Sequence, residues 1–171
     1  MKNVAALALT IRDGCPALHA RAAGRVLARL YDDALRDIGL EMSQLPLLAA
    51  VAIGGDHGFK VTDLARGLVM DRTSLTRAIK PLEKAGLLRV ARSPNDARLK
   101  IVIITHAGEG RLRDAYPRWR RMTKRIREVF GPARIDTLMA ELSRLVTDGS
   151  ELIVEPGKRH PAPTVNATAR G

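Results

Sequence analysis

The stretch from residue 61 to residue 105 constrains the fold more than any other part of this sequence. It contains two short helical patterns, followed by two apolar runs that enclose a polar turn. In the first pattern Leu64, Ala65 and Leu68 fall on one face at the 3.6-residue period, and we expect Thr62 to cap that helix. The order of these elements predicts a small unit in which a ribbon follows two helices.

The second pattern, which we expect Asp71 to cap, carries short hydrogen-bonding and cationic side chains in its first two turns. A major groove about 12 Å wide admits a helix, and side chains of this kind near the helix N-terminus read the edges of the bases. We therefore expect a recognition helix here. Its predicted DNA contacts are Arg72, Thr73, Ser74, Thr76, Arg77 and Lys80.

Pro81 divides the recognition helix into two parts. It removes the amide that would bond to the carbonyl of Arg77, and so it invites a kink. We expect the residues before Pro81 to face nucleic acid and those after it to pack on the core, with Gly86 as the C-terminal stop. The predicted core residues of this segment are Leu75, Ile79, Leu82, Ala85, Leu87 and Leu88.

Two β-branched runs, over residues 88–90 and 101–104, predict a ribbon with its turn at residues 93–96. An arginine on a thin, protruding loop suits the narrow and strongly negative minor groove. Asp96 can accept a hydrogen bond from the guanidinium of Arg98 and hold it extended. The predicted DNA contacts of the ribbon are Arg92, Asn95, Asp96, Arg98 and Lys100. Two helices and such a ribbon form a winged helix-turn-helix.

The charge of the chain indicates an anionic partner. The formal net charge is +11, and residues 60–100 hold ten basic and four acidic side chains, against six of each in residues 1–59. An arginine-rich composition alone raises the charge without implying a partner, whereas clustering on the winged unit favours DNA binding. Aromatic residues make up only 3% of the chain, too few for the platforms that stack single-stranded bases. Duplex DNA is therefore the expected partner.

Helical patterns also precede the winged unit. A long one over residues 16–38 ends at Gly39, and a shorter one, which we expect Ser43 to cap, closes at the Gly54-Gly55 pair. Residues 56–60 fit either a loop or a short edge strand beside the ribbon.

Residues 106–130 predict one long helix that Pro117 can bend, and a last helix opens at Pro132. Many arginines lie along this long helix. They form either a solvated face or a surface that lines the duplex or an anionic ligand, and both interpretations stay open.

Two segments carry a resemblance to a known family. The triplet Asp96-Ala97-Arg98 precedes a β run that ends at Thr105, and MDRTSLTRAIKPLEKAGLL lies upstream. With these residues the sequence resembles the MarR family of bacterial transcription regulators over roughly residues 15–153. The resemblance implies a mainly α fold with a small β wing, and helices from both ends that interlock into a homodimer. It also implies a pseudo-palindromic operator, with half-sites about one turn apart.

The resemblance gives a division of the chain into parts. These are residues 1–14, an N-terminal arm; 15–38 and 106–153, a helical dimerisation region; 39–105, the winged helix-turn-helix; and 154–171, a flexible tail.

A small-molecule effector is implied as well, often an aromatic or phenolic acid held between the dimerisation helices and the winged unit. A ligand there would change the separation of the two recognition helices and weaken DNA binding. The residues that we expect to line this pocket are Cys15, His19, Arg21, Leu47, Arg113, Tyr116 and Trp119.

Cys15 is the only redox candidate. It lies at the start of a long helix, whose dipole favours a thiolate. In the family that the sequence resembles, hydroperoxide sensors carry a reactive cysteine at a similar place, with tyrosines bonded to the thiolate; here His19 stands one turn further on. The alternative is that Cys15 is a small buried hydrophobic residue at the dimer interface.

Signatures of other functions are absent from the sequence. It has no P-loop, no dinucleotide fingerprint and no Cys or His pair at zinc spacing, so we expect no enzyme, metal or cofactor. No apolar run is long enough to span a membrane, and Arg12 and Asp13 interrupt the only stretch that resembles a signal peptide. We therefore expect a cytoplasmic protein.

These patterns predict a dimeric, sequence-specific transcription regulator, a repressor released by a small molecule. Two alternatives remain: a repressor switched by oxidation of Cys15, and an architectural DNA-binding protein without sequence preference.

Overall fold

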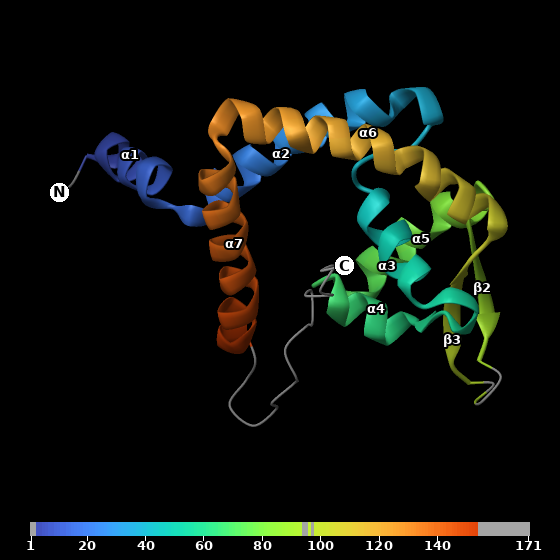
Figure 1. The fold of residues 1–171 in the computed structure, drawn as a ribbon. Coiled ribbons are helices and arrows are strands. Elements are labelled where there is room, and N and C mark those ends of the chain that lie inside the picture. The colour runs from blue at the N-terminus through green and yellow to red at the C-terminus, as the bar shows by residue number, and fades with distance from the viewer. Residues whose placement is uncertain (1–2, 94–95, 97, 154–171) are drawn as a thin grey trace.

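The computed structural model describes residues 3–93, 96 and 98–153. The long helices α2 and α6 lie side by side across one end of the molecule, and the winged unit lies below one half of α6 (Figure 1). Beyond the other half of α6 the chain turns sharply into α7, whereas α1 extends away from the body (Figure 1). The helices are α1 (Val4–Gly14), α2 (Pro16–Leu35), α3 (Leu45–Ile53), α4 (Val61–Gly67), α5 (Arg72–Lys84), α6 (His106–Phe130) and α7 (Pro132–Ile153), with short 3-10 turns η1 (Arg36–Ile38) and η2 (Gly55–His57).

The wing is a three-stranded antiparallel sheet in the order β1-β3-β2. Its strands are β1 (Phe59–Lys60), β2 (Leu88–Arg92) and β3 (Lys100–Ile104). Both ribbon strands are confirmed, and residues 59–60 form the short edge strand that the sequence left as one of two options. Val102 pairs with Phe59 on one side and with Val90 on the other, so these three side chains share one face of the sheet. That face covers the core.

The core lies between α3, α4, α5, the inner face of the wing and the first half of α6. Leu48, Val51, Leu75 and Val102 are fully enclosed there. The apolar stripe predicted for α5 is therefore confirmed, as are Leu82, Leu87 and Leu88.

α5 has the start and the end that the sequence predicts. The Asp71 carboxylate accepts a hydrogen bond from the amide of Ser74 at 2.8 Å and caps the helix. At the other end Gly86 has a φ of 71°, and the amide of Leu87 donates to the carbonyl of Leu82 at 2.9 Å. This is a Schellman ending, which requires the left-handed conformation that glycine adopts without strain.

Three details of the sequence-based prediction are wrong. Thr62 does not cap α4, because the helix starts directly from β1 and its N-cap is Lys60. Ser43 does not cap α3: the N-cap is Gln44, and the Ser43 hydroxyl donates to Glu41 at 3.1 Å. Ala85 is exposed instead of packed, because it is the C-cap of α5, directly before the chain turns at Gly86.

α6 starts where the C-terminal end of α5 meets the sheet. The Thr105 side chain accepts from the amide of Gly108 at 3.0 Å, and its hydroxyl donates to the carbonyl of Gly86 at 2.6 Å. Gly108 is buried against the carbonyl of Leu87. The first turn of α6 therefore lies too close to the backbone of another element for any side chain at position 108.

Two glycines in this turn of α6 provide a matched test of that close approach. A Cβ at Gly108 would lie 2.1 Å from the carbonyl oxygen of Leu87, whereas one at Gly110 meets nothing within 4 Å. We expect Gly108→Ala to lower the free energy of unfolding by roughly 1–3 kcal/mol through overpacking. Gly110→Ala should raise it by up to about 1 kcal/mol, because alanine favours the helix. Urea unfolding followed by circular dichroism measures both, and equal midpoints for the two variants would contradict the packing described.

Candidate nucleic-acid interface

The start of α5 presents cationic side chains without internal partners. Arg72, Arg77 and Lys80 are exposed, and among the residues that the structure describes their side chains make no hydrogen bond or ion pair. Thr73 is exposed beside them. Four of the six side chains predicted to contact DNA from this helix thus remain available to an external anion or base.

The other two hydroxyls are already bonded within the helix. Ser74 is half-buried and donates to the Asp71 carboxylate at 2.5 Å, while Thr76 donates to the carbonyl of Arg72 at 2.7 Å. The hydroxyl and the amide of Ser74 stabilise the ionised carboxylate and lower the pKa of Asp71. Ser74 therefore fixes the start of the recognition helix, a role that the sequence pattern did not reveal.

Val69 lies in the turn between α4 and α5 and has a φ of 53°. It is the single non-glycine residue with positive φ among the described residues. A β-branched side chain is strained in this left-handed conformation, and such strain is often found at functional sites. The turn leaves Val69 55% exposed beside the start of α5. No sequence signal predicts this conformation, because valine is not typical of turns.

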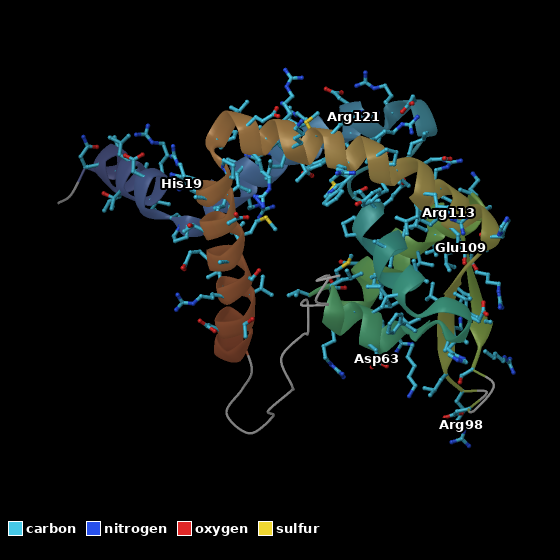
Figure 2. All side chains as sticks on the ribbon, in the orientation of Figure 1. His19, Asp63, Arg98, Glu109, Arg113 and Arg121 are labelled. Atoms are coloured by element: carbon cyan, nitrogen blue, oxygen red, sulfur yellow. The ribbon has the colours of Figure 1, made fainter. Side chains whose placement is uncertain are left out.

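The wing carries Arg98 at its far tip, pointing away from the body (Figure 2). Asp96 accepts a hydrogen bond from the backbone amide of Arg98 at 2.9 Å, rather than from its guanidinium as predicted. An aspartate two residues before an amide closes a local turn more readily than it reaches a long side chain. The guanidinium thus remains unpaired within the described part of the chain, and Asn95 lies outside that part.

The strand ends next to the turn of the wing add two further cations. Arg92 and Lys100 are cross-strand partners at the end of the β2–β3 ladder, and both are exposed. Cations that no internal carboxylate satisfies are the groups that displace counterions from a phosphate backbone. The recognition helix and the wing therefore both present such groups.

Comparison with known proteins identifies this arrangement. A model of the MarR family matches residues 38–99. The M. tuberculosis transcriptional regulator MosR, solved in complex with DNA, is 30% identical with a TM-score of 0.69, and the match covers 82% of this chain and 99% of MosR. The chain belongs to the MarR family.

Structures of lower sequence identity share the fold. A mutant of MarR from E. coli, complexed with operator DNA, is 17% identical with a TM-score of 0.71 over 80% of this chain and 97% of that one. CouR from Rhodococcus jostii RHA1, bound to p-coumaroyl-CoA, is 20% identical with a TM-score of 0.63 over 75% and 90%. No protein of curated function matches the sequence.

The arginines of α6 in this MarR-family chain do not form one surface. Arg118 donates to both carboxylate oxygens of Asp37 in η1, with Nε–Oδ1 at 2.9 Å and Nη2–Oδ2 at 2.5 Å, and this pairing lowers the pKa of Asp37. Arg111 donates to the carbonyl of Ile38, and Arg127 donates to Asp136 of α7 at 2.7 Å. These three side chains connect η1 and α7 to α6. Arg121, by contrast, projects from the end of the molecule opposite Arg98 (Figure 2).

The residues predicted to line an effector pocket are not brought together within one chain. His19 lies near the N-terminal end of α2, whereas Arg113 lies near the wing (Figure 2). Leu47 is enclosed in the core, Arg113 pairs with Glu109 at 3.1 Å, and exposed Tyr116 stacks on Trp119 with ring centroids 5.9 Å apart. Arg21 is exposed on α2.

Cys15 is half-buried at the N-cap of α2. The ring of His19 lies 3.0 Å from the carbonyl oxygen of Cys15, so its hydrogen bond is to the backbone and not to sulfur.

The described residues contain neither a candidate metal site nor a candidate membrane-spanning helix. Within them no three His, Cys, Asp or Glu side chains are grouped closely enough to hold a metal ion. None of the helices described combines the length and the apolar composition that a membrane span requires.

The lowered pKa of Asp71 makes the start of the recognition helix sensitive to acid. A carboxylate whose pKa is lower in the folded state than in the unfolded state contributes stability at neutral pH, and this contribution is lost as the pH falls below about 4. Asp71→Asn keeps a capping oxygen but does not titrate. We therefore expect the unfolding midpoint of the wild type to exceed that of Asp71→Asn at pH 7, and the difference to shrink by pH 3. A difference in urea midpoint that stays constant across this range would contradict the role assigned to the carboxylate.

Proposed function

We propose that this protein is a homodimeric, sequence-specific repressor that binds duplex DNA in the cytoplasm and leaves it when a small-molecule effector binds. The observation that carries the proposal is the set of unpaired cations on two separate projections, the start of α5 and the wing. An isolated solvated face gives cations on one surface, whereas a duplex offers two grooves for two projections. The DNA complex of MosR supports the same partner.

The two projections have different tasks in this proposal. The start of α5 enters the major groove, where Arg72 and Arg77 can each donate two hydrogen bonds to a guanine edge. Arg98 on the wing enters the minor groove, where the potential attracts a guanidinium without a unique base pattern. Sequence preference thus comes from α5, and the wing mainly adds affinity.

Dimerisation is supported by large apolar side chains that are exposed to water in the single chain. They lie on α1, α2 and α7, the helices outside the winged unit, and on α7 they recur at the helical period. Leaving so many large apolar side chains in water is unfavourable, and a second copy related by a twofold axis would cover them. These residues are Val4, Leu7, Leu9, Ile11, Leu18, Val26, Leu27, Leu30, Leu138, Met139, Leu142 and Leu145.

The effector is the remaining part of the proposal. CouR has been solved with p-coumaroyl-CoA, but at 20% identity that likeness speaks for the fold alone. Release from DNA by this mechanism needs a ligand with different affinities for two spacings of the recognition helices. Because the predicted lining residues lie apart in one chain, a pocket built from them would need the second copy.

DNA binding can be tested with a pair of arginines at opposite ends of the molecule. We expect tight binding to a duplex from the gene's own upstream region, with a preference of about 10³ or more over random duplex. Arg98→Ala should weaken binding and reduce the salt slope by about one unit, whereas Arg121→Ala should change neither. Fluorescence anisotropy at several salt concentrations measures all three proteins. Equal affinity for both duplexes would point to the architectural alternative. Equal effects of the two substitutions would show that the wing is not part of the DNA interface.

The dimer can be tested with two apolar side chains that are both exposed in the single chain. Leu142 lies in the apolar stripe of α7, whereas Ile53 lies at the end of α3, which packs against β3 and α5 of the winged unit. We expect Leu142→Arg to shift the protein to monomers and to weaken DNA binding, because it buries an unpaired charge between the copies. Ile53→Arg should leave the dimer intact. Sedimentation velocity distinguishes these outcomes, and a dimeric Leu142→Arg protein would exclude this face of α7.

A further inference from the structure

The turn between α4 and α5 ends α4 in a Schellman motif. The amide of Met70 donates to the carbonyl of Ala65 at 2.8 Å, and the amide of Val69 donates to the carbonyl of Arg66 at 3.1 Å. These two bonds place Val69 where the chain takes the left-handed conformation after a helix, and its φ is 53°. Glycine is the usual residue there, because it has no Cβ to strain. Residue 69 is thus a position for glycine that holds valine.

The end of α5 shows the same motif with the expected residue. Gly86 has a φ of 71°, its amide donates to Glu83 at 2.9 Å, and the next amide donates to Leu82 at 2.9 Å. The two helix ends are therefore built alike and differ in the left-handed residue. Valine at position 69 strains the backbone and contributes little to the core, since Val69 is 55% exposed. A strained residue with an exposed side chain is typical of a functional contact.

Val69 lies beside the part of α5 that is proposed to enter DNA. It precedes the N-cap Asp71 by two residues, and the N-terminal residues of a recognition helix are those that reach base edges in the major groove. Asp63 of α4 and Arg98 of the wing both lie at the end of the molecule away from Arg121 (Figure 2). The turn that follows α4 thus belongs to the surface that the proposed function turns toward the duplex.

This surface has few hydroxyl protons left for reading bases. Ser74 donates its proton to the carboxylate of the N-cap at 2.5 Å, and Thr76 donates to the carbonyl of Arg72 at 2.7 Å. Thr76 is nevertheless exposed, so its methyl group is offered to solvent together with the side chain of Val69. Apart from the cations and Thr73, the surface therefore offers DNA mainly apolar groups.

We propose that Val69 is a specificity-determining residue that packs against the 5-methyl group of a thymine in each half-site. The thymine methyl is the apolar group that base edges present in the major groove. An isopropyl group forms no hydrogen bond, so it selects thymine only through contact with this methyl. This role rests on the proposed function and deepens it. Guanine edges go to the arginines of α5, and a thymine lies next to the turn before the helix.

The strain at Val69 makes stability and DNA affinity respond in opposite directions to one substitution. Val69→Gly relieves the left-handed strain and should raise the unfolding midpoint in urea, while the loss of the apolar contact should weaken DNA binding. Val69→Ala removes the isopropyl group without the flexibility of glycine, so it should lose the same DNA contact. A lower urea midpoint in Val69→Gly would contradict the strain.

The test of the contact uses duplexes that the full-length protein selects from a random pool. Each thymine of the selected site is replaced in turn by uracil, which pairs with adenine in the same way and lacks only the 5-methyl group. We expect one symmetric pair of thymines at which the replacement lowers wild-type affinity by about fourfold for each half-site, the factor for one buried methyl group. At that pair Val69→Gly and Val69→Ala should bind the thymine and uracil duplexes equally. Fluorescence anisotropy measures all of these affinities.

Thr76→Ser is the matched control. It removes one methyl group from α5 and keeps the hydroxyl that bonds to the carbonyl of Arg72. This variant should retain the wild-type preference for thymine over uracil at the pair assigned to Val69. A preference that persists in both Val69 variants, or that disappears only in Thr76→Ser, would overturn the role of Val69.

The selection separates a failure of this role from a failure of the proposed function. If the wild type enriches no sequence, sequence-specific binding fails, and the role of Val69 fails with it. If the wild type enriches a sequence but no uracil replacement weakens its binding, the regulator reads DNA without the methyl contact. In that case only the role of Val69 is overturned.

Discussion

The junction at the carbonyl of Leu87 holds the winged unit together. This oxygen accepts from the amide of Thr105 at 3.1 Å, and the first turn of α6 packs against it through Gly108. The hydroxyl of Thr105 donates to the carbonyl of Gly86, just after the end of α5. The recognition helix, the wing and the long helix α6 thus meet within a few residues. Because a packed interior resists deformation, the position of α5 relative to the wing is set here.

A second set of contacts connects this unit to the helices proposed to form the dimer. Arg118 and Arg111 of α6 hold η1, the link between α2 and the winged unit, through Asp37 and the carbonyl of Ile38. Tyr31 of α2 and Thr123 of α6 are joined by a hydrogen bond of 2.8 Å. These contacts lie on the path by which a change in the dimer would reach the recognition helix. Some cations of α6 therefore connect elements of the fold, whereas Arg72, Arg77 and Arg98 have no partner among the described residues.

Much of the winged unit could be predicted from local chemistry. Asp71, Gly86 and the β-branched runs act within a few residues, so their effect on the backbone does not depend on distant parts of the chain. The predictions failed where a distant element decides. Thr62 had a good capping side chain, but β1 pairs with β3 and fixes the helix start at Val61. Arg98 is a suitable cation two residues after Asp96, but the local turn brings the backbone amide of Arg98, and not its guanidinium, to the Asp96 carboxylate.

The sequence by itself determined the order of helices and strands, the cationic character of α5 and the wing, and the buried stripe of α5. These follow from side-chain type and period, which each segment carries alone. Only the tertiary structure decided which cations stay unpaired, because pairs such as Arg118 with Asp37 join residues that are 81 positions apart. It also decided that His19 and Arg113 lie apart and that Ile101 and Ile103 are buried although they lie on the face of β3 opposite the core. The two-residue alternation along β3 does not distinguish the two faces of the strand. The faces differ physically in what each of them packs against.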